Sequence, residues 1–516
     1  MTSAPPSEPT RKRTTADFGP LSGDIGSQTM HGSIAALSAQ GIRMGLQLAT
    51  TMVLARLLTP EDFGLIAIVA VVLGFSNLFA DFGLSAATVQ RKELDHNTLS
   101  VLFYIQLGIG LVLTAGIMLA APLFADFFDD DRITLLVIAM APTLLFQAAA
   151  AQHIALLQRR MMWLKMQGVP IIAMACGSVA AIALTLTTDI GYWALVVQIW
   201  IAAVMTCAMA WAFSLWRPGR VSDWSAAAPV VKFGLNLTGY NILNGWHRQF
   251  DNIIIGAVVG PQQLGYYSRA YGLLMLPLTA VVRPFNSAVY PAMSRLQAEP
   301  DRWSRMFLSS VATITCITAP LAGLLVLLAD VIIPLLFGDQ WLPSIDIFQV
   351  LSISMMVHPV YTAAGLLSFT LGRSRHMLYA SIVSTAIYTV AFVIGIEWGA
   401  IGVAASYTVA VFLIVPPWVW WSARGTSVRA MRVFGAVAPP IFAATVALLI
   451  AGLSPLNQQG IGSAMVEGLV FCVIYAGLLL ACWLFFKEWR KDVDPAKTRV
   501  LAMIDGAFAR FGGRRG

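Results

Sequence analysis

The chain has 516 residues, of which 58% are hydrophobic and only 11% are charged, and its mean hydropathy is +0.74. A soluble protein of this length needs far more polar surface, so the composition argues against a soluble enzyme and predicts an all-α, polytopic membrane protein. The net charge of +7 could suggest a nucleic-acid partner, but the positions of the basic residues give it another explanation, described below.

Residues 1–30 are polar and lack the apolar core of a signal peptide, so they are predicted to form a disordered cytosolic tail. A membrane-spanning helix needs about 20 mostly apolar residues, and fourteen later segments meet this requirement. They lie near 32–56, 62–88, 98–122, 133–157, 168–187, 191–215, 232–258, 263–292, 307–329, 344–370, 377–396, 399–421, 433–453 and 464–486.

We interpret these segments as two six-helix lobes with two appended helices. The predicted parts are an N-lobe (31–215, helices 1–6), a cytosolic linker (216–231), a C-lobe (232–421, helices 7–12), appended helices 13–14 (433–486) and a basic cytosolic tail (487–516). Trp216 and Trp224 of the linker are expected at the membrane interface. Pro277, Pro284 and Pro359 predict bends in the eighth and tenth helices.

The basic residues separate sharply between the two faces of the membrane. If the N-terminus is cytosolic, the cytosolic loops and tails hold 27 Lys and Arg residues, whereas the opposite face holds only Arg56 and Arg132. The loops of that opposite face carry acids such as Glu61, Asp130 and Asp189. The positive-inside rule then predicts that both termini are cytosolic, and it explains the basic charge without nucleic acid.

The two halves repeat a pattern at an offset of 201 residues. LTPEDFG at 58–64 matches VGPQQLG at 259–265, and a polar stripe precedes each of these turns. The stripes occupy matching positions with helical spacing, so each lies on one helix face. They are Gln40, Arg43, Gln47 and Thr50 in the first helix and Asn241, Asn244, Arg248 and Asp251 in the seventh. A weaker match joins LQRRMMWL at 157–164 with LGRSRHML at 371–378, at an offset of 214.

Charged residues within a bilayer need partners or water, because each costs about 2.5–3.5 kcal/mol on insertion scales. One interpretation pairs Arg248 with Asp251 as a structural ion pair. The other places both stripes on a hydrated cavity between the lobes, to which Arg283 in the eighth helix and Asp81 in the second would contribute. Asp81 could also be a helix-end acid. Arg269, among three tyrosines, fits interface anchoring as well as substrate contact.

The arginines make the predicted cavity cationic, which favours an anionic cargo, since the guanidinium fork donates two parallel hydrogen bonds to phosphate. The Asn and Gln side chains suit sugar hydroxyls. No metal or cofactor is expected: the five cysteines and the histidines 153, 247 and 358 are scattered, and packing is their default role. FFDDDR at 127–132 is interpreted as a solvated acidic turn rather than a metal site, and no GxxxxGK[ST] motif occurs.

The segment ARLLTPEDFGLIAIVAVVLGFSNLFADFGLSAATVQRKELD at 55–95 resembles the first two helices of the polysaccharide transporter branch of the multidrug/oligosaccharidyl-lipid/polysaccharide exporter superfamily. DNIIIGAVVGPQQLGYYSRAY at 251–271 and LQRRMMWLK at 157–165 also resemble that family, and the resemblance covers roughly 30–490. It implies a Wzx-like flippase that moves undecaprenyl-pyrophosphate-linked oligosaccharide across the bacterial inner membrane for exopolysaccharide, capsule or O-antigen synthesis. It also implies two six-helix lobes around a cationic cavity.

On this hypothesis the lobes alternate access to a site built from seven side chains. The candidate substrate-binding residues are Arg43, Arg248, Arg283, Gln40, Gln47, Asn241 and Asn244. Asp81 and Asp251 are candidates for coupling to a proton or sodium ion. The expected partners are the lipid-linked oligosaccharide and membrane lipid, with a polysaccharide polymerase and a chain-length regulator as further candidates.

Three rival functions remain open at this point. The first is an ion-coupled drug or small-molecule exporter of the same superfamily, which would favour carboxylates in the cavity. The second is a membrane glycosyltransferase or polysaccharide polymerase, which would need a large outer loop. The third is a structural scaffold, against which the intramembrane arginines argue.

Overall fold

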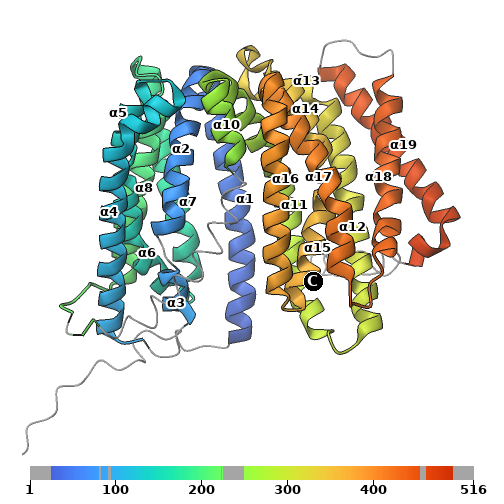
Figure 1. The fold of residues 1–516 in the computed structure, drawn as a ribbon, viewed down its shortest axis with the longest axis horizontal. Coiled ribbons are helices and arrows are strands. Elements are labelled where there is room, and N and C mark those ends of the chain that lie inside the picture. The colour runs from blue at the N-terminus through green and yellow to red at the C-terminus, as the bar shows by residue number, and fades with distance from the viewer. Residues whose placement is uncertain are drawn as a thin grey trace, which may run out of the picture. The chain divides into compact units, whose positions relative to one another are not determined.

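The computed structural model describes residues 25–80, 83–90, 94–221, 223–224, 249–453 and 461–491. These residues are predominantly helical, and no strand occurs within them (Figure 1). Nine helical stretches of this part of the chain are long and apolar enough to cross a membrane, or ten if one bent pair forms a span. The predicted all-α, polytopic fold is confirmed, whereas the count of fourteen spans stays a prediction.

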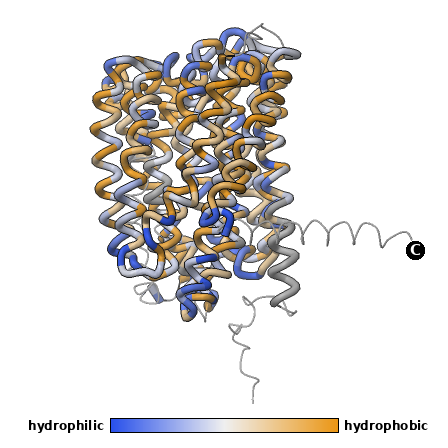
Figure 2. The backbone as a smooth tube through the Cα atoms, turned by 90° about the vertical axis from the view of Figure 1, so that its right-hand side faces the viewer, coloured by the Kyte–Doolittle hydropathy of each residue, from blue (hydrophilic) through white to orange (hydrophobic). Residues whose placement is uncertain are grey.

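The chain forms two compact units, residues 1–249 and 250–516, and each is described by itself. The predicted lobe boundaries and the linker at 216–231 stay predictions, since 222 and 225–248 lie outside the described residues. On the side of the molecule that Figure 2 shows, hydrophilic residues concentrate near the helix ends, and hydrophobic residues predominate between them. This distribution is what a helix crossing a bilayer requires.

The first unit contains eight described helices. They are α1 (Ile25–Leu57), α2 (Pro60–Ala80), α3 (Leu84–Gln90), α4 (His96–Phe128), α5 (Arg132–Met140), α6 (Thr143–Arg159), α7 (Trp163–Thr187) and α8 (Trp193–Ser214). The helix α6 packs against both α4 and α8, and α7 packs against α1 and α8. A Cβ atom at Gly177 of α7 would lie 2.5 Å from the carbonyl oxygen of Gln198 in α8, so only glycine permits this approach.

The second unit contains the remaining helices. They are α10 (Phe250–Val258), α11 (Pro261–Arg295), α12 (Pro300–Leu327), α13 (Ala329–Phe337), α14 (Ser344–Ser354), α15 (His358–Thr370), α16 (Ser374–Gly395), α17 (Gly399–Ala423), α18 (Ala430–Gly452) and α19 (Ile461–Phe485), with short 3-10 turns η3 (Asp339–Trp341) and η4 (Ile396–Trp398). The predicted bend at Pro359 is confirmed, because α14 and α15 meet at 42° just before it.

The repeat recognised in the sequence is visible in the helix boundaries. Helices α1 and α10 end 201 residues apart, at Leu57 and Val258, and α2 and α11 begin at the matched prolines, Pro60 and Pro261. The second match needs a correction. Helices α6 and α15 end 211 residues apart, not 214, as do the starts of α7 and α16. In this register Met161, with φ of 54°, matches Gly372, with φ of 66°, so the same left-handed turn recurs.

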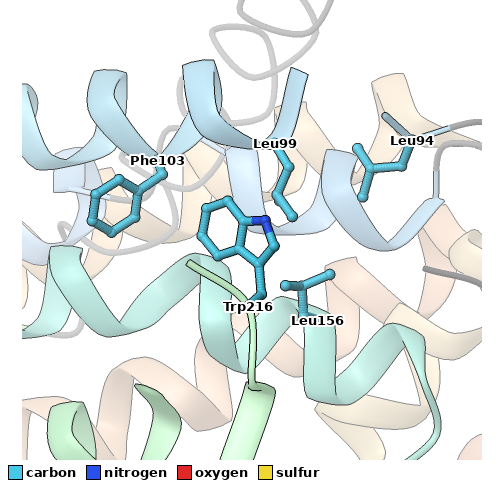
Figure 3. Packing of buried hydrophobic residues seen from close by; sticks show 5 residues of the cluster. All are labelled: Leu94, Leu99, Phe103, Leu156 and Trp216. Carbon is cyan, nitrogen blue, oxygen red and sulfur yellow. The ribbon is translucent and has the colours of Figure 1, made fainter. Parts of the chain in front are cut away.

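Trp216 was predicted at the membrane interface, and this prediction is wrong. Its side chain is buried among Leu94, Leu99, Phe103 and Leu156, which belong to α4, α6 and the segment before α4 (Figure 3). Its indole Nε1 donates to Nδ1 of His96 over 3.2 Å. Trp224, in contrast, is 58% exposed. The chain after α8 is thus held by an aromatic contact that apolar composition alone did not indicate.

Candidate functional site

The polar stripe of the first unit lies on α1. Arg43 is half-buried, and its Nη2 donates to Oε1 of Gln167 in α7 over 2.6 Å. Gln40 is half-buried, Gln47 is exposed, and Thr50 is buried. The hydrogen bond fixes the guanidinium to a second helix. Because arginine carries five N–H donors and Gln167 takes one, the group retains the capacity to bind an anion.

The matching stripe of the second half is only partly described. Asn241, Asn244 and Arg248 lie outside the described residues, as does Asp81. Asp251 is described at the start of α10 and is 6% exposed. Its Oδ2 accepts a hydrogen bond from the hydroxyl of Tyr267 over 2.8 Å, and its Oδ1 accepts from the amide of Asn252 at the same distance. The alternative ion pair between Arg248 and Asp251 stays a prediction.

Aromatic rings surround this carboxylate. Tyr267 stacks on Tyr271 with centroids 6.1 Å apart, and Tyr271 meets the ring of Tyr407 in α17 at 6.4 Å. Tyr407 stacks in turn on Tyr388 of α16 at 5.6 Å. Tyr266 and Tyr267, which flank Arg269 in the sequence, are both buried, and the choice between interface anchoring and substrate contact for Arg269 stays a prediction. Asp251 is therefore a polar group enclosed by a cluster of tyrosines from three helices.

Arg283 is exposed on α11 and lies far from Asp251. Sixteen residues of α11 separate it from Tyr267, the partner of Asp251. At 1.5 Å per residue this is about 24 Å along the helix, so the structure does not bring the two charges together. Arg43 belongs to the first unit and Asp251 and Arg283 to the second. The cavity that would unite all three stays a prediction.

A buried polar chain in the first unit escaped the sequence analysis. Thr88 Oγ1 donates to Oε1 of Gln152 over 2.7 Å, and Nε2 of Gln152 donates to Oε1 of Gln106 over 2.9 Å. Arg159 Nη1 donates to the carbonyl of Thr88 over 2.9 Å. These bonds attach α3, which lies within the family-like segment 55–95, to α4 and α6. Their spacing of 46 and 64 residues leaves no periodic signal along the chain.

The histidines and the acidic turn follow the predicted structural roles where they are described. His153 is buried, with its Nδ1 2.7 Å from the hydroxyl of Ser214 and its ring against Trp211, so packing is confirmed. In FFDDDR, Arg132 pairs with Asp130 at 2.7 Å and with Glu61 of α2 at 2.6 Å. The hydrogen bond from Arg132 lowers the pKa of Asp130. His247 lies outside the described residues. Within the part of the chain that the structure describes, no group of three or more His, Cys, Asp or Glu side chains could hold a metal ion.

Comparisons with known proteins place this geometry in context. A family model described as "Polysaccharide biosynthesis protein" matches residues 53–346. The lipopolysaccharide biosynthesis protein WzxC of Escherichia coli K12 is 25% identical over 389 residues, which are 74% of this chain and 78% of that protein. The succinoglycan biosynthesis transport protein ExoT of Rhizobium meliloti is 26% identical over 60% of this chain and 63% of that protein.

The fold also resembles solved structures. The inward closed conformation of the lipid II flippase MurJ superposes with a TM-score of 0.71 at 13% identity, over 88% of this chain and 99% of that one. The multidrug transporter DinF-BH superposes with a TM-score of 0.54 at 15% identity, over 80% of this chain and 97% of that one. At these identities the likeness concerns the fold, which is that of polytopic helical transporters.

Proposed function

Since this chain belongs to the polysaccharide biosynthesis protein family, whose model matches residues 53–346, we propose that it is a flippase for lipid-linked oligosaccharide. The cargo is an undecaprenyl-pyrophosphate-linked repeat unit for exopolysaccharide, capsule or O-antigen synthesis. The family match carries this proposal. The functions of its relatives support it, since one takes part in lipopolysaccharide biosynthesis and another in succinoglycan biosynthesis and transport. The chain acts as a transporter and not as an enzyme.

The proposed binding site uses arginines for the pyrophosphate and amides for the sugars. Arg43 supports this assignment because Gln167 holds its guanidinium in one orientation within a membrane helix. An oriented guanidinium loses less conformational freedom when it binds a phosphate oxygen pair. The remaining members of the proposed site are Arg248, Arg283, Gln40, Gln47, Asn241 and Asn244.

The proposed coupling groups are the carboxylates Asp81 and Asp251. Asp251 fits the role because it is buried and hydrogen-bonded by Tyr267, and a membrane carboxylate in such surroundings is a functional candidate by default. We expect Asp251→Asn to insert normally, since the amide can still accept from Tyr267, but to abolish the response of transport to a proton or sodium gradient. The measurement is cargo movement in proteoliposomes with each gradient imposed in turn. A normal gradient response in both Asp251→Asn and Asp81→Asn would remove coupling from the proposal.

The protein is a multi-span membrane protein, and we propose that it lies in the bacterial inner membrane with both termini cytosolic. A basic cytosolic surface and acidic outer loops support this orientation. A polysaccharide polymerase and a chain-length regulator are proposed partners, because a flipped repeat unit must be polymerised on the other side.

The test is leaflet-resolved accumulation of lipid-linked oligosaccharide in cells that lack this protein. We expect build-up on the cytosolic leaflet that wild type relieves and that Arg248→Ala, at wild-type abundance, does not. Arg305→Ala is the matched control, since it removes an exposed arginine of α12 outside the proposed site and should relieve the build-up fully. Absence of build-up while polymer is still made would reject this cargo and leave export of drugs or small molecules as the leading function.

A further inference from the structure

A groove lies between α18 and α19, where α18 begins and α19 finishes, with a volume of about 1080 Å³. Its walls are apolar and uncovered: Met431 is 78% exposed, Phe442 60% and Phe485 82%. Its floor is fixed by Trp489, which is buried and donates from Nε1 to the carbonyl of Ala436 over 2.9 Å. Since α18 and α19 are long and apolar enough to cross a membrane, the walls of the groove are suited to contact hydrocarbon.

The mouth of the groove is basic. Arg429, Arg432 and Lys487 line it against a single carboxylate, Glu488. That carboxylate is shared between Arg432 at 3.2 Å and Lys491 at 3.1 Å. Arg429 and Lys487 are exposed, and neither forms an ion pair with any residue that the structure describes. The lining thus retains two positive charges at the point where the apolar walls open.

The groove mouth lies at the basic end of the second unit. Ser427, just before α18, donates from its hydroxyl to the carbonyl of Pro300, the first residue of α12, over 2.9 Å. The exposed arginines Arg302 and Arg305 follow in the first turns of α12. A lipid bound at this end of the helices would place its headgroup against positive charge and its chains against apolar side chains.

We propose that this groove holds an anionic diacyl phospholipid, with its phosphate at Arg429, Arg432 and Lys487 and its acyl chains against Met431, Phe442 and Phe485. Charge decides between this occupant and two others. The segment 492–516, which follows the described residues, carries five Lys and Arg residues against three acids, so the basic mouth would repel it. A second copy of the chain in a two-fold contact would bring the same cations together. The lipid is a resident ligand and not the transported cargo, so the proposal is independent of the flippase assignment.

The experiment is native mass spectrometry of the purified full-length protein in detergent, titrated with phosphatidylglycerol or phosphatidylcholine. We expect wild type to retain phosphatidylglycerol preferentially. The electrostatic attraction of one basic residue to anionic lipid raises the affinity about fivefold. The double variant Arg429→Gln/Lys487→Gln should therefore bind phosphatidylglycerol about thirtyfold more weakly. Arg295→Gln/Arg305→Gln is the matched control; it removes two exposed arginines outside the groove and should bind as wild type does.

A second variant tests the volume of the groove with all charges kept. Gly435 lines the groove, and a Cβ atom there would meet nothing within 4 Å. Gly435→Trp should therefore fold, fill the space and displace phosphatidylglycerol. Equal binding of the two lipids by wild type, or unchanged binding in both groove variants, would overturn the proposal. A dimer in wild type that Gly435→Trp dissociates would overturn it in favour of a second copy.

Discussion

At the scale of single residues, the cations and carboxylates of this protein act through the partner that orients each of them. Arg43 is held by Gln167, Asp251 by Tyr267 and Asp130 by Arg132. An intramembrane charge with a fixed partner costs less to insert than an isolated one, and it points in a defined direction. Substitution of the partner is therefore as informative as substitution of the charge.

Arg43→Ala should lower transport roughly ten- to hundredfold, because hydrogen bonds to charged groups contribute about 1.5–3 kcal/mol. Gln167→Ala should lower it less, since the guanidinium remains but loses its orientation. Arg43→Lys should not restore the rate, because one ammonium cannot reproduce the planar fork. The measurement is the initial rate of cargo movement in proteoliposomes containing equal amounts of each variant. Full activity of Arg43→Ala would remove this residue from the proposed site.

The lowered pKa of Asp130 predicts that the stability of the folded protein depends on pH. Its pKa in the folded protein is lowered by the hydrogen bond from Arg132, so its stabilising effect is present above the unfolded pKa of about 3.9. The effect is lost as pH falls through the lowered value. Because the side chain of Arg132 is 43% exposed, its pair with Asp130 contributes about 0.2–1 kcal/mol.

Asp130→Asn should consequently lower the melting temperature slightly at pH 7 and progressively less as the pH falls below the unfolded pKa of about 3.9. Asp126→Asn, which removes an exposed acid from the last turn of α4, is the control and should leave the melting temperature unchanged at every pH. The readout is thermal unfolding in detergent across this pH range. An equal destabilisation at both ends of the range would show that the ion pair is not the cause.

At the scale of helices, small residues set how closely neighbours approach. Gly177 permits the contact of α7 with α8, and Gly395 and Gly402 permit that of α16 with α17. Close helix contacts of this kind replace the hydrophobic effect, which does not operate between helices in lipid. Gln167 lies on the same helix, ten residues before Gly177 or about 15 Å along the axis, so this contact helps to position the helix that bears the partner of Arg43.

Gly177→Ala should destabilise the protein by about 1–3 kcal/mol, because the obstructing atom is backbone and cannot rotate away. Gly168→Ala is the matched control on the same helix, since a Cβ there would meet nothing within 4 Å. We expect thermal unfolding in detergent to separate the two variants clearly. If Gly168→Ala proves as destabilising, helix propensity and not packing would account for both.

The sequence predicted where the helices begin and end more accurately than which side chains meet between helices. Turn signals such as Pro60 and Pro261 gave the helix starts to within a few residues, because proline at the first helical position is a local preference. The offset of 214 was wrong by three, since sequence matching followed Arg and Leu identities rather than the left-handed residues Met161 and Gly372. The contact of Asp251 with Tyr267 was not foreseen, because two helices and an intervening turn decide it. The joint site of Arg43, Arg248 and Arg283 stays a prediction.

At the scale of the whole molecule, acids and bases occupy opposite ends within each unit. In the first unit Glu61 pairs with Arg132 at one end, while Arg160 donates to the carbonyl of Ser214 at the other. In the second unit Arg373 donates to the carbonyls of Arg424 and Gly425 at the basic end. This segregation makes the proposed orientation testable without any knowledge of the cargo.

Reporter fusions provide that test. Alkaline phosphatase inserted after Asp189 should be active, and the same insertion after Gly425 should be inactive, because the enzyme folds only outside the cytosol. Green fluorescent protein should give the opposite pattern at the two sites. Activity of the phosphatase at Gly425 would reverse the proposed orientation and, with it, the direction in which cargo enters.

The division of the chain into two units of continuous sequence also bears on how the protein is made. The first unit is continuous in sequence, and its helices α1 to α8 lie within residues 25–214, so all of them are synthesised before α10. At the usual 5–20 residues per second, synthesis of the second unit then takes on the order of tens of seconds. During this interval the insertion machinery holds a complete half-transporter. Arg43 and Gln167 can thus form their hydrogen bond before α10, which bears Asp251, enters the bilayer.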